Sequence, residues 1–168
     1  MTSVNRKTEI ISAAIEVFAE TGYFRATTAQ VAERAKISQP YIFKFFASKE
    51  ALLLSALEAS WERIIDSFRL VVESASKEQL ETDLIKAYEK ILASHQNEIL
   101  LQMQAQTIPE PSIREAMREA FRGIRQIVLT AFREAGIENP EERTLIFLAR
   151  GMLCNISVAL DMPELMEE

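Results

Sequence analysis

The residues between Thr27 and Lys49 combine hydrogen-bonding, aromatic and basic side chains at a spacing suited to contacting a nucleic acid. Gln39 carries an amide that can pair with the edge of a base, and Lys44 carries a cation for phosphate or guanine. Tyr41 adds a hydroxyl for phosphate or a ring for a thymine methyl group. The alternative is that these are ordinary solvated side chains on a small helical domain.

Two short helices must hold these side chains in place. The first is predicted to open at Thr27, which has a capping-box partner, Gln30, three residues on. After a turn at 36–38, a second helix is predicted at 39–46, whose inner face carries Ile42 and Phe46. This is the spacing of a helix-turn-helix, in which the start of the second helix enters the major groove of DNA.

No other set of residues has the spacing of a catalytic or metal site. The chain has a single histidine, His95, and a single cysteine, Cys154, which excludes the usual His/Cys zinc sites. Its four glycines are too dispersed to form a phosphate-binding loop. We therefore expect no enzyme activity, no metal and no cofactor.

Composition and charge are those of a soluble helical protein. Hydrophobic residues make up 48% of the 168 residues and recur at helical spacing, which predicts an all-α fold. The net charge is −6, so a basic coat for nucleic acid is excluded. Residues 1–50 carry seven basic and five acidic side chains, a balance of +2, and the remaining twelve basic and twenty acidic ones give −8.

Longer helices are predicted in the rest of the chain. One is capped by Ser48 and ends near residue 74, and the next opens with a capping box of Ser76 and Gln79. Residues 97–106 either continue that helix or form a separate turn. Prolines then break the chain before two last helices at 113–135 and 140–161. Gly151 lies inside the last one, which fits the close approach of another helix.

Residues 6–54 resemble the tetracycline-repressor (TetR-like) family of bacterial transcription regulators. The resemblance rests on the order and spacing of the runs at 10–23, 27–32, 37–38 and 46–52. It implies a homodimer with a three-helix DNA-binding head, here 1–50. It also implies a helical-bundle body, here 51–168, which binds a small ligand and forms the dimer interface.

The resemblance also implies roles for individual residues of the head. Thr28 and Lys49 are expected to contact phosphate, and Gln39, Tyr41 and Lys44 to contact bases or backbone. Thr27 adds a second hydroxyl at the start of its helix. The family often has a tyrosine where Phe43 stands, so this hydroxyl is missing here. We expect Phe43 and Phe45 to pack inward; the alternative is contact with sugar and thymine methyl groups.

The expected body has two functional surfaces. Aromatic, sulfur-containing and polar side chains on its helices are candidates for a ligand pocket: Trp61, Tyr88, His95, Met103, Gln104, Met117, Phe121 and Asn155. The alternative is that each belongs to the core. Helices 113–135 and 140–161 have broad apolar faces and are expected to form the homodimer as a four-helix bundle.

The expected function is therefore that of a DNA-binding regulator. It would repress transcription from a palindromic operator and be released by a small, largely apolar effector. The alternative is a helical ligand-binding or adaptor protein without operator binding. Residues 1–7 lack the apolar core of a signal peptide, and no run reaches about 18 uninterrupted apolar residues. We therefore expect a cytoplasmic protein with no membrane partner.

Overall fold

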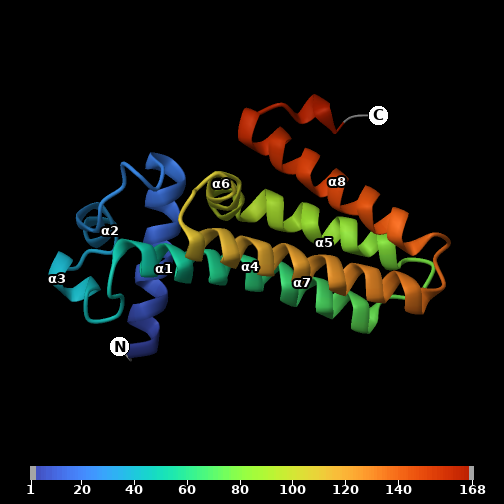
Figure 1. Cartoon of the computed structure of the whole chain (residues 1–168), viewed down its shortest axis with the longest axis horizontal. Helices are drawn as coiled ribbons and strands as arrows, with labels where there is room; N and C mark the ends of the chain where they lie inside the picture. Colours follow the sequence, from blue (N-terminus) through green and yellow to red (C-terminus); the bar gives the residue numbers. More distant parts are fainter. Residues whose placement is uncertain (1–2, 167–168) are drawn as a thin grey trace. The chain divides into compact units, whose positions relative to one another are not determined.

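The computed structural model describes residues 3–166 of the chain. Within that range the regular structure is helical and contains no strand, which confirms the all-α prediction (Figure 1). The elements are α1 (Ser3–Thr21), α2 (Thr28–Arg34), α3 (Gln39–Ile42), α4 (Lys49–Ser74), α5 (Leu80–Ser94), α6 (Gln96–Ala105), α7 (Pro111–Ala135), α8 (Pro140–Leu160) and the short 3-10 helix η1 (Pro163–Leu165).

Local sequence signals account for most helix boundaries. At the start of α2 the Thr27 hydroxyl accepts from the backbone nitrogen of Gln30 at 3.2 Å. The Gln30 side chain accepts in return from the Thr27 backbone at 2.9 Å, which confirms the predicted capping box. Gly22 follows α1 with φ of 81°, a conformation that favours glycine. The Ser48 hydroxyl accepts from the Ala51 backbone at 3.0 Å and caps α4 as predicted.

Two predicted details are wrong. The helix expected at 39–46 ends at Ile42, because the chain then tightens into i→i+3 bonds, from Lys44 N to Tyr41 O at 3.2 Å and from Phe45 N to Ile42 O at 2.9 Å. The capping box expected of Ser76 and Gln79 is absent. Instead the Gln79 backbone donates to the Ser76 carbonyl at 3.1 Å, and the side chain of Gln79 caps nothing.

The chain divides into two compact units. Unit 1 comprises residues 1–60 and 97–117, and unit 2 comprises residues 61–96 and 118–168. Helices α4 and α7 each contribute residues to both. The expected head, 1–50, falls inside unit 1, and the functional division into 1–50 and 51–168 remains a prediction.

Unit 1 surrounds the helix-turn-helix with a continuous apolar core. Helix α2 packs against both α1 and α3. The fully buried side chains come from all parts of the unit: Ile10, Phe18, Val31, Ile42, Leu52, Leu53, Leu57, Ile99 and Leu101. Helix α6 is tied to α1 by a bond from the Gln104 side chain to the Ala19 carbonyl at 2.8 Å. Residues 96–105 form a separate helix of ten residues, whereas the sequence predicted either a continuation of the preceding helix or a separate turn.

Unit 2 is built around a chain of aromatic rings. Phe147 of α8 lies 5.8 Å from Phe68 and 6.0 Å from Phe132, measured between ring centroids, and Phe68 lies 6.2 Å from Tyr88. All these contacts are edge-to-face, the arrangement that aromatic rings prefer. Tyr88 also lies against Gly151, where an added Cβ would meet its ring at 3.7 Å. The side chain of Tyr88 on α5 thus contacts α8 at Gly151, but at an ordinary van der Waals distance that does not itself require glycine.

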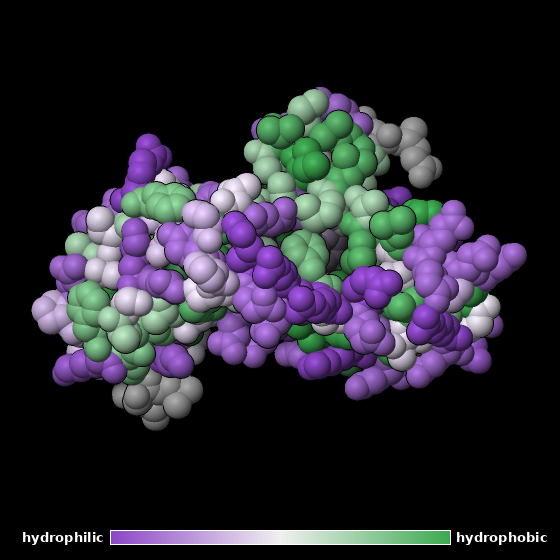
Figure 2. Space-filling model, in the orientation of Figure 1, coloured by the Kyte–Doolittle hydropathy of each residue, from purple (hydrophilic) through white to green (hydrophobic). Residues whose placement is uncertain are grey.

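Helix α8 has an exposed apolar face. Figure 2 shows hydrophobic residues gathered there, and the exposed ones are Leu145, Ile146, Leu153, Ile156 and Leu160. By length and composition alone α8 is apolar enough to cross a membrane. However, its other side lies in the core of unit 2, where Phe147 and Cys154 are buried. The exposed side of α7, in contrast, is largely charged and includes Arg114 and Arg125.

Lys36 has a left-handed backbone conformation, with φ of 55°. Its backbone donates to the Glu33 carbonyl at 3.0 Å and that of Ile37 to Ala32 at 2.9 Å, which is the hydrogen-bond pattern of a Schellman motif. Glycine is the residue that this position favours. Replacing Lys36 with glycine should therefore raise the free energy of unfolding by about 1 kcal/mol, measured by urea denaturation. Lys36→Ala keeps the strain and is the control; equal stability of the two variants would contradict this explanation.

Candidate functional site

The first turns of α2 and α3 meet at two of the predicted DNA-binding residues. The Gln39 amide nitrogen donates to the Thr28 hydroxyl at 2.8 Å, and Thr28 is only 8% exposed. The hydroxyl of Thr27 is occupied by its capping box. Gln39 remains exposed at the start of α3, so its amide oxygen is available to a base edge while its nitrogen fixes the orientation of the side chain.

A cation and an aromatic ring lie together on the exposed side of α3 and the turn after it. The Lys44 ammonium lies 4.9 Å from the centre of the Tyr41 ring, a cation–π contact that holds the side chain at this surface. Phe45 is half-buried and packs edge-on against Tyr41 at 5.4 Å, so it packs inward only in part. Phe43 does not pack inward: it is 50% exposed, so that expectation is wrong. Its ring adds apolar surface beside Lys44.

The ammonium group of Lys49 binds groups within the head itself. Its ammonium donates to the carbonyls of Tyr23 at 2.8 Å and Ala26 at 3.0 Å, and lies 4.5 Å from the centre of the Tyr23 ring. The next residue, Glu50, accepts a hydrogen bond from Ser112 at the start of α7. Lys49 therefore joins the start of α4 to the loop before α2, and its predicted phosphate contact remains a prediction.

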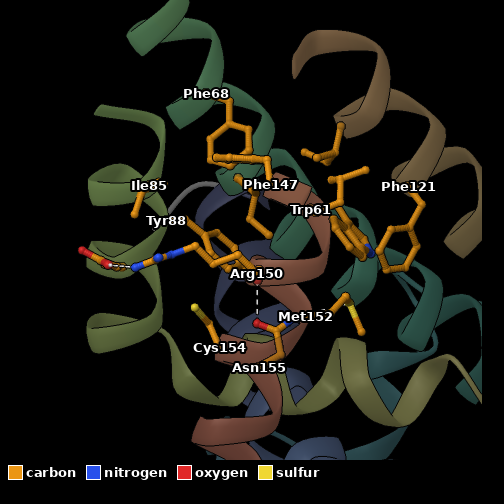
Figure 3. A pocket seen from close by; sticks show the side chains of 15 residues that line it. Trp61, Phe68, Ile85, Tyr88, Phe121, Phe147, Arg150, Met152, Cys154 and Asn155 are labelled. Carbon is orange, nitrogen blue, oxygen red and sulfur yellow. Dashed lines mark hydrogen bonds and ion pairs between the residues drawn. The ribbon is translucent and has the colours of Figure 1, made fainter. Parts of the chain in front are cut away.

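The second candidate site is a cavity in unit 2, lined by fifteen residues of α4, α5, α7 and α8 (Figure 3). Four of the predicted ligand-binding residues line it: Trp61, Tyr88, Phe121 and Asn155. The other four do not. Met103, Gln104 and Met117 belong to unit 1, and His95 ends α5. The cavity volume is about 60 Å³, well below the roughly 300 Å³ at which ligand pockets begin.

The wall of this cavity is apolar except for a few side chains. The Tyr88 hydroxyl donates to the Asn155 side-chain oxygen at 2.6 Å. Arg150 and Glu89, both partly exposed, also line the cavity, with 3.9 Å between their charged groups. Sequence reasoning missed these two, together with Met152 and Cys154, which have the residue types of ordinary helix surface or core. Within residues 3–166, no group of three His, Cys, Asp or Glu side chains is placed to hold a metal ion.

Burial of Tyr88 makes stability depend on pH. Burial raises the pKa of its hydroxyl from 10.0 to about 12, because the charged phenolate is poorly solvated there. Burial of the uncharged Tyr88 hydroxyl therefore contributes fully to the free energy of unfolding below pH 10. This contribution, roughly 2–3 kcal/mol in total, is lost as the pH rises from 10 to 12. We expect urea denaturation to show that the wild-type protein loses about 2 kcal/mol more than Tyr88→Phe between pH 8 and 11.5. Parallel losses in the two proteins would contradict this pKa.

Comparison with known proteins identifies the head. The family model for bacterial regulatory proteins of the tetR family matches residues 10–56, from α1 into α4. The head, residues 10–56, is that of a TetR-family protein. Because proteins with this head are regulators of transcription, the chain is a DNA-binding regulator and not an enzyme.

Known regulators are similar to the chain either over most of its length or over a shorter segment. The fatty acid metabolism regulator protein of Bacillus subtilis is 26% identical over 149 residues, which is 86% of this chain and 76% of that protein. The regulator UidR of Escherichia coli K12 is 25% identical over 161 residues, covering 89% of this chain and 81% of UidR. HbdR of Aromatoleum sp. is 40% identical over 53 residues, 32% of this chain and 23% of HbdR.

Solved structures share the fold of this chain over most of its length. FadR from Bacillus subtilis, in complex with stearoyl-CoA, superimposes with a TM-score of 0.79 at 20% identity, over 92% of this chain and 88% of FadR. The ketosteroid transcriptional regulator KstR2 of Mycobacterium tuberculosis gives a TM-score of 0.72 at 20% identity, over 92% and 82% of the two chains. At these identities the likeness concerns the fold alone.

Proposed function

We propose that the chain is a homodimeric repressor that binds a palindromic operator and is released by a small, largely apolar ligand. The observation that carries this proposal is the head, where Gln39, Tyr41 and Lys44 lie at the exposed start of α3 and the turn after it. In a helix-turn-helix this is the part that enters the major groove. A dimer reads two half-sites about 34–36 Å apart, which is why a palindrome is expected.

The exposed face of α8 supports the homodimer. Leu145 and Leu160 are 66% and 60% exposed and lie at opposite ends of the same helix. Monomeric proteins rarely expose a continuous apolar patch of this kind, and a second copy of α8 would cover it symmetrically. Since the exposed side of α7 is largely charged, we infer that α8 supplies the apolar centre of the interface and that α7 flanks it.

The cavity of unit 2 supports an apolar ligand. Its aromatic wall resembles the lining of small-molecule sites, and FadR binds stearoyl-CoA in its solved complex. At about 60 Å³ the cavity holds no ligand of that size, so binding must displace lining side chains. A ligand that prefers the enlarged form lowers the population of the form described here. If only the latter fits the operator, the ligand releases DNA.

The first test is binding of the purified protein to fragments of its own upstream region. We expect one palindromic fragment to bind more tightly than random DNA, with an affinity that falls steeply as salt rises, because phosphate contacts release counterions. The protein should act in the cytoplasm, where this DNA lies. If no fragment competes better than random DNA at any salt concentration, the alternative of a ligand-binding or adaptor protein without operator binding is favoured.

A further inference from the structure

One buried amide in the cavity has a donor that the protein does not use well. Asn155 is 6% exposed, and its side-chain oxygen accepts from Tyr88 at 2.6 Å, which fixes the orientation of the amide. Its nitrogen then faces only the sulfur of Met152, at 4.0 Å. Because a thioether is a weak acceptor, this buried donor is nearly unsatisfied, a state that costs about 1–3 kcal/mol.

A second buried donor lines the same cavity. The indole nitrogen of Trp61 is buried and has no hydrogen-bond partner in the described part of the chain. Its ring lies 5.1 Å from that of Phe121, which offers neither an oxygen nor a nitrogen as acceptor. Trp61, Met152 and Asn155 all line the cavity (Figure 3). Two residues with poorly satisfied donors therefore line the cavity, and the one carboxylate of its lining, that of Glu89, pairs with Arg150.

Met152 is suited to give way to such an acceptor. Its unbranched side chain adopts several rotamers at low cost and fills irregular gaps. The cavity wall also argues against a charged ligand group. Arg150 is the only cationic side chain in the lining; it lies 3.9 Å from the carboxylate of Glu89, and its side chain is 42% exposed. A buried carboxylate would have no other cation to pair with.

We propose that the ligand of this cavity is an apolar molecule with an uncharged carbonyl group, whose oxygen accepts from Asn155 Nδ2 in place of the Met152 sulfur. Trp61 Nε1 is the second donor available to the same ligand. Ketones, esters and thioesters carry this group, whereas hydrocarbons and free carboxylates do not. The inference rests on the proposed function, because it names the chemistry of the ligand that would occupy this cavity.

A matched pair of probes tests the proposal. Cyclohexanone and methylenecyclohexane have nearly the same shape and differ in a C=O for a C=CH₂ group. Trp61 is the only tryptophan of the chain, so its fluorescence reports binding to this cavity directly. We expect cyclohexanone to bind at least about fivefold more tightly, since it satisfies a buried donor. Cyclohexanecarboxylate should bind more weakly than the ketone.

Variants assign the preference to individual donors. Asn155→Asp keeps an acceptor for Tyr88 and removes the donor, so the preference for the ketone should fall to the smaller preference that Trp61 alone supports; Asn97→Asp on α6 is the control. Trp61→Phe, read by ligand-observed NMR, should reduce the preference and retain binding. Met152→Ala should tighten binding of both probes.

The outcomes separate this inference from the proposed function. Equal binding of the two probes to the wild-type protein, or an undiminished preference in Asn155→Asp, would overturn the carbonyl assignment and leave the cavity as a ligand site. If neither probe binds to the wild-type protein or to Met152→Ala, the cavity is not a site for small apolar molecules. The ligand part of the proposed function then fails as well.

Discussion

Lys44→Ala is expected to lower the affinity of the dimer for its operator by roughly 30- to 10⁴-fold, because each lost base or phosphate contact is worth about 1–3 kcal/mol and the dimer loses two. The ammonium of Lys44 is exposed and held over the Tyr41 ring, and no ion pair of Lys44 is present in the described part of the chain. Binding to a labelled operator fragment at several salt concentrations measures the effect. The salt dependence should become less steep as well.

The matched control is Lys86→Ala on α5. Lys86 is also an exposed lysine and forms only a loose pair with Asp83 at 3.8 Å. Its removal changes the net charge by the same amount as that of Lys44 and should leave operator binding within about twofold, since it lies outside the head. Wild-type affinity in Lys44→Ala would contradict the assignment of this residue. It would favour the protein without operator binding.

Leu145→Glu is expected to dissociate the homodimer. Leu145 is 66% exposed on α8, and the proposed interface would bury two copies of it. Burying even an uncharged polar group without a partner costs about 1–3 kcal/mol, and a carboxylate costs more, so two glutamates should raise the dimer dissociation constant by roughly 30-fold or more. Sedimentation velocity measures the change. Operator binding should weaken in parallel, since a single head reads only one half-site.

Leu70→Glu is the control for this prediction. Leu70 on α4 is also 66% exposed and lies outside the proposed interface. The Leu70→Glu variant should remain dimeric, because no subunit contact is expected at Leu70. A Leu145→Glu variant that stays fully dimeric would show that the subunits associate through another surface.

Local signals in the sequence predicted most of the fold. The capping box of Thr27, the glycine after α1 and the prolines before α7 and α8 each act within a few residues, so their effect can be read without knowing the tertiary structure. The length of α3 could not be predicted in this way. Its last turn tightens within the buried environment of Ile42 and Phe46, which is a tertiary effect.

The candidate sites were less predictable than the helices. Residue types alone singled out Trp61 and Asn155, which line the cavity, but also Met117, which is buried in unit 1. Only the packing of four helices decides which of these side chains share one space. Lys49 shows a related limit. Its partners are backbone carbonyls of the 23–26 loop, and no pattern of side chains indicates them.

The first two residues of α4 act as a fixed joint. Lys49 ties the helix to the loop before α2, and Glu50 ties it to Ser112 of α7. If the chain were flexible here, α4 could tilt without moving the head. Because Lys49 and Glu50 hold the start of α4 on two sides, a tilt of α4 is expected to move the head with it. Loosening it with Lys49→Met should therefore separate the two functions. The protein would still bind its ligand, but ligand binding would no longer change its affinity for DNA.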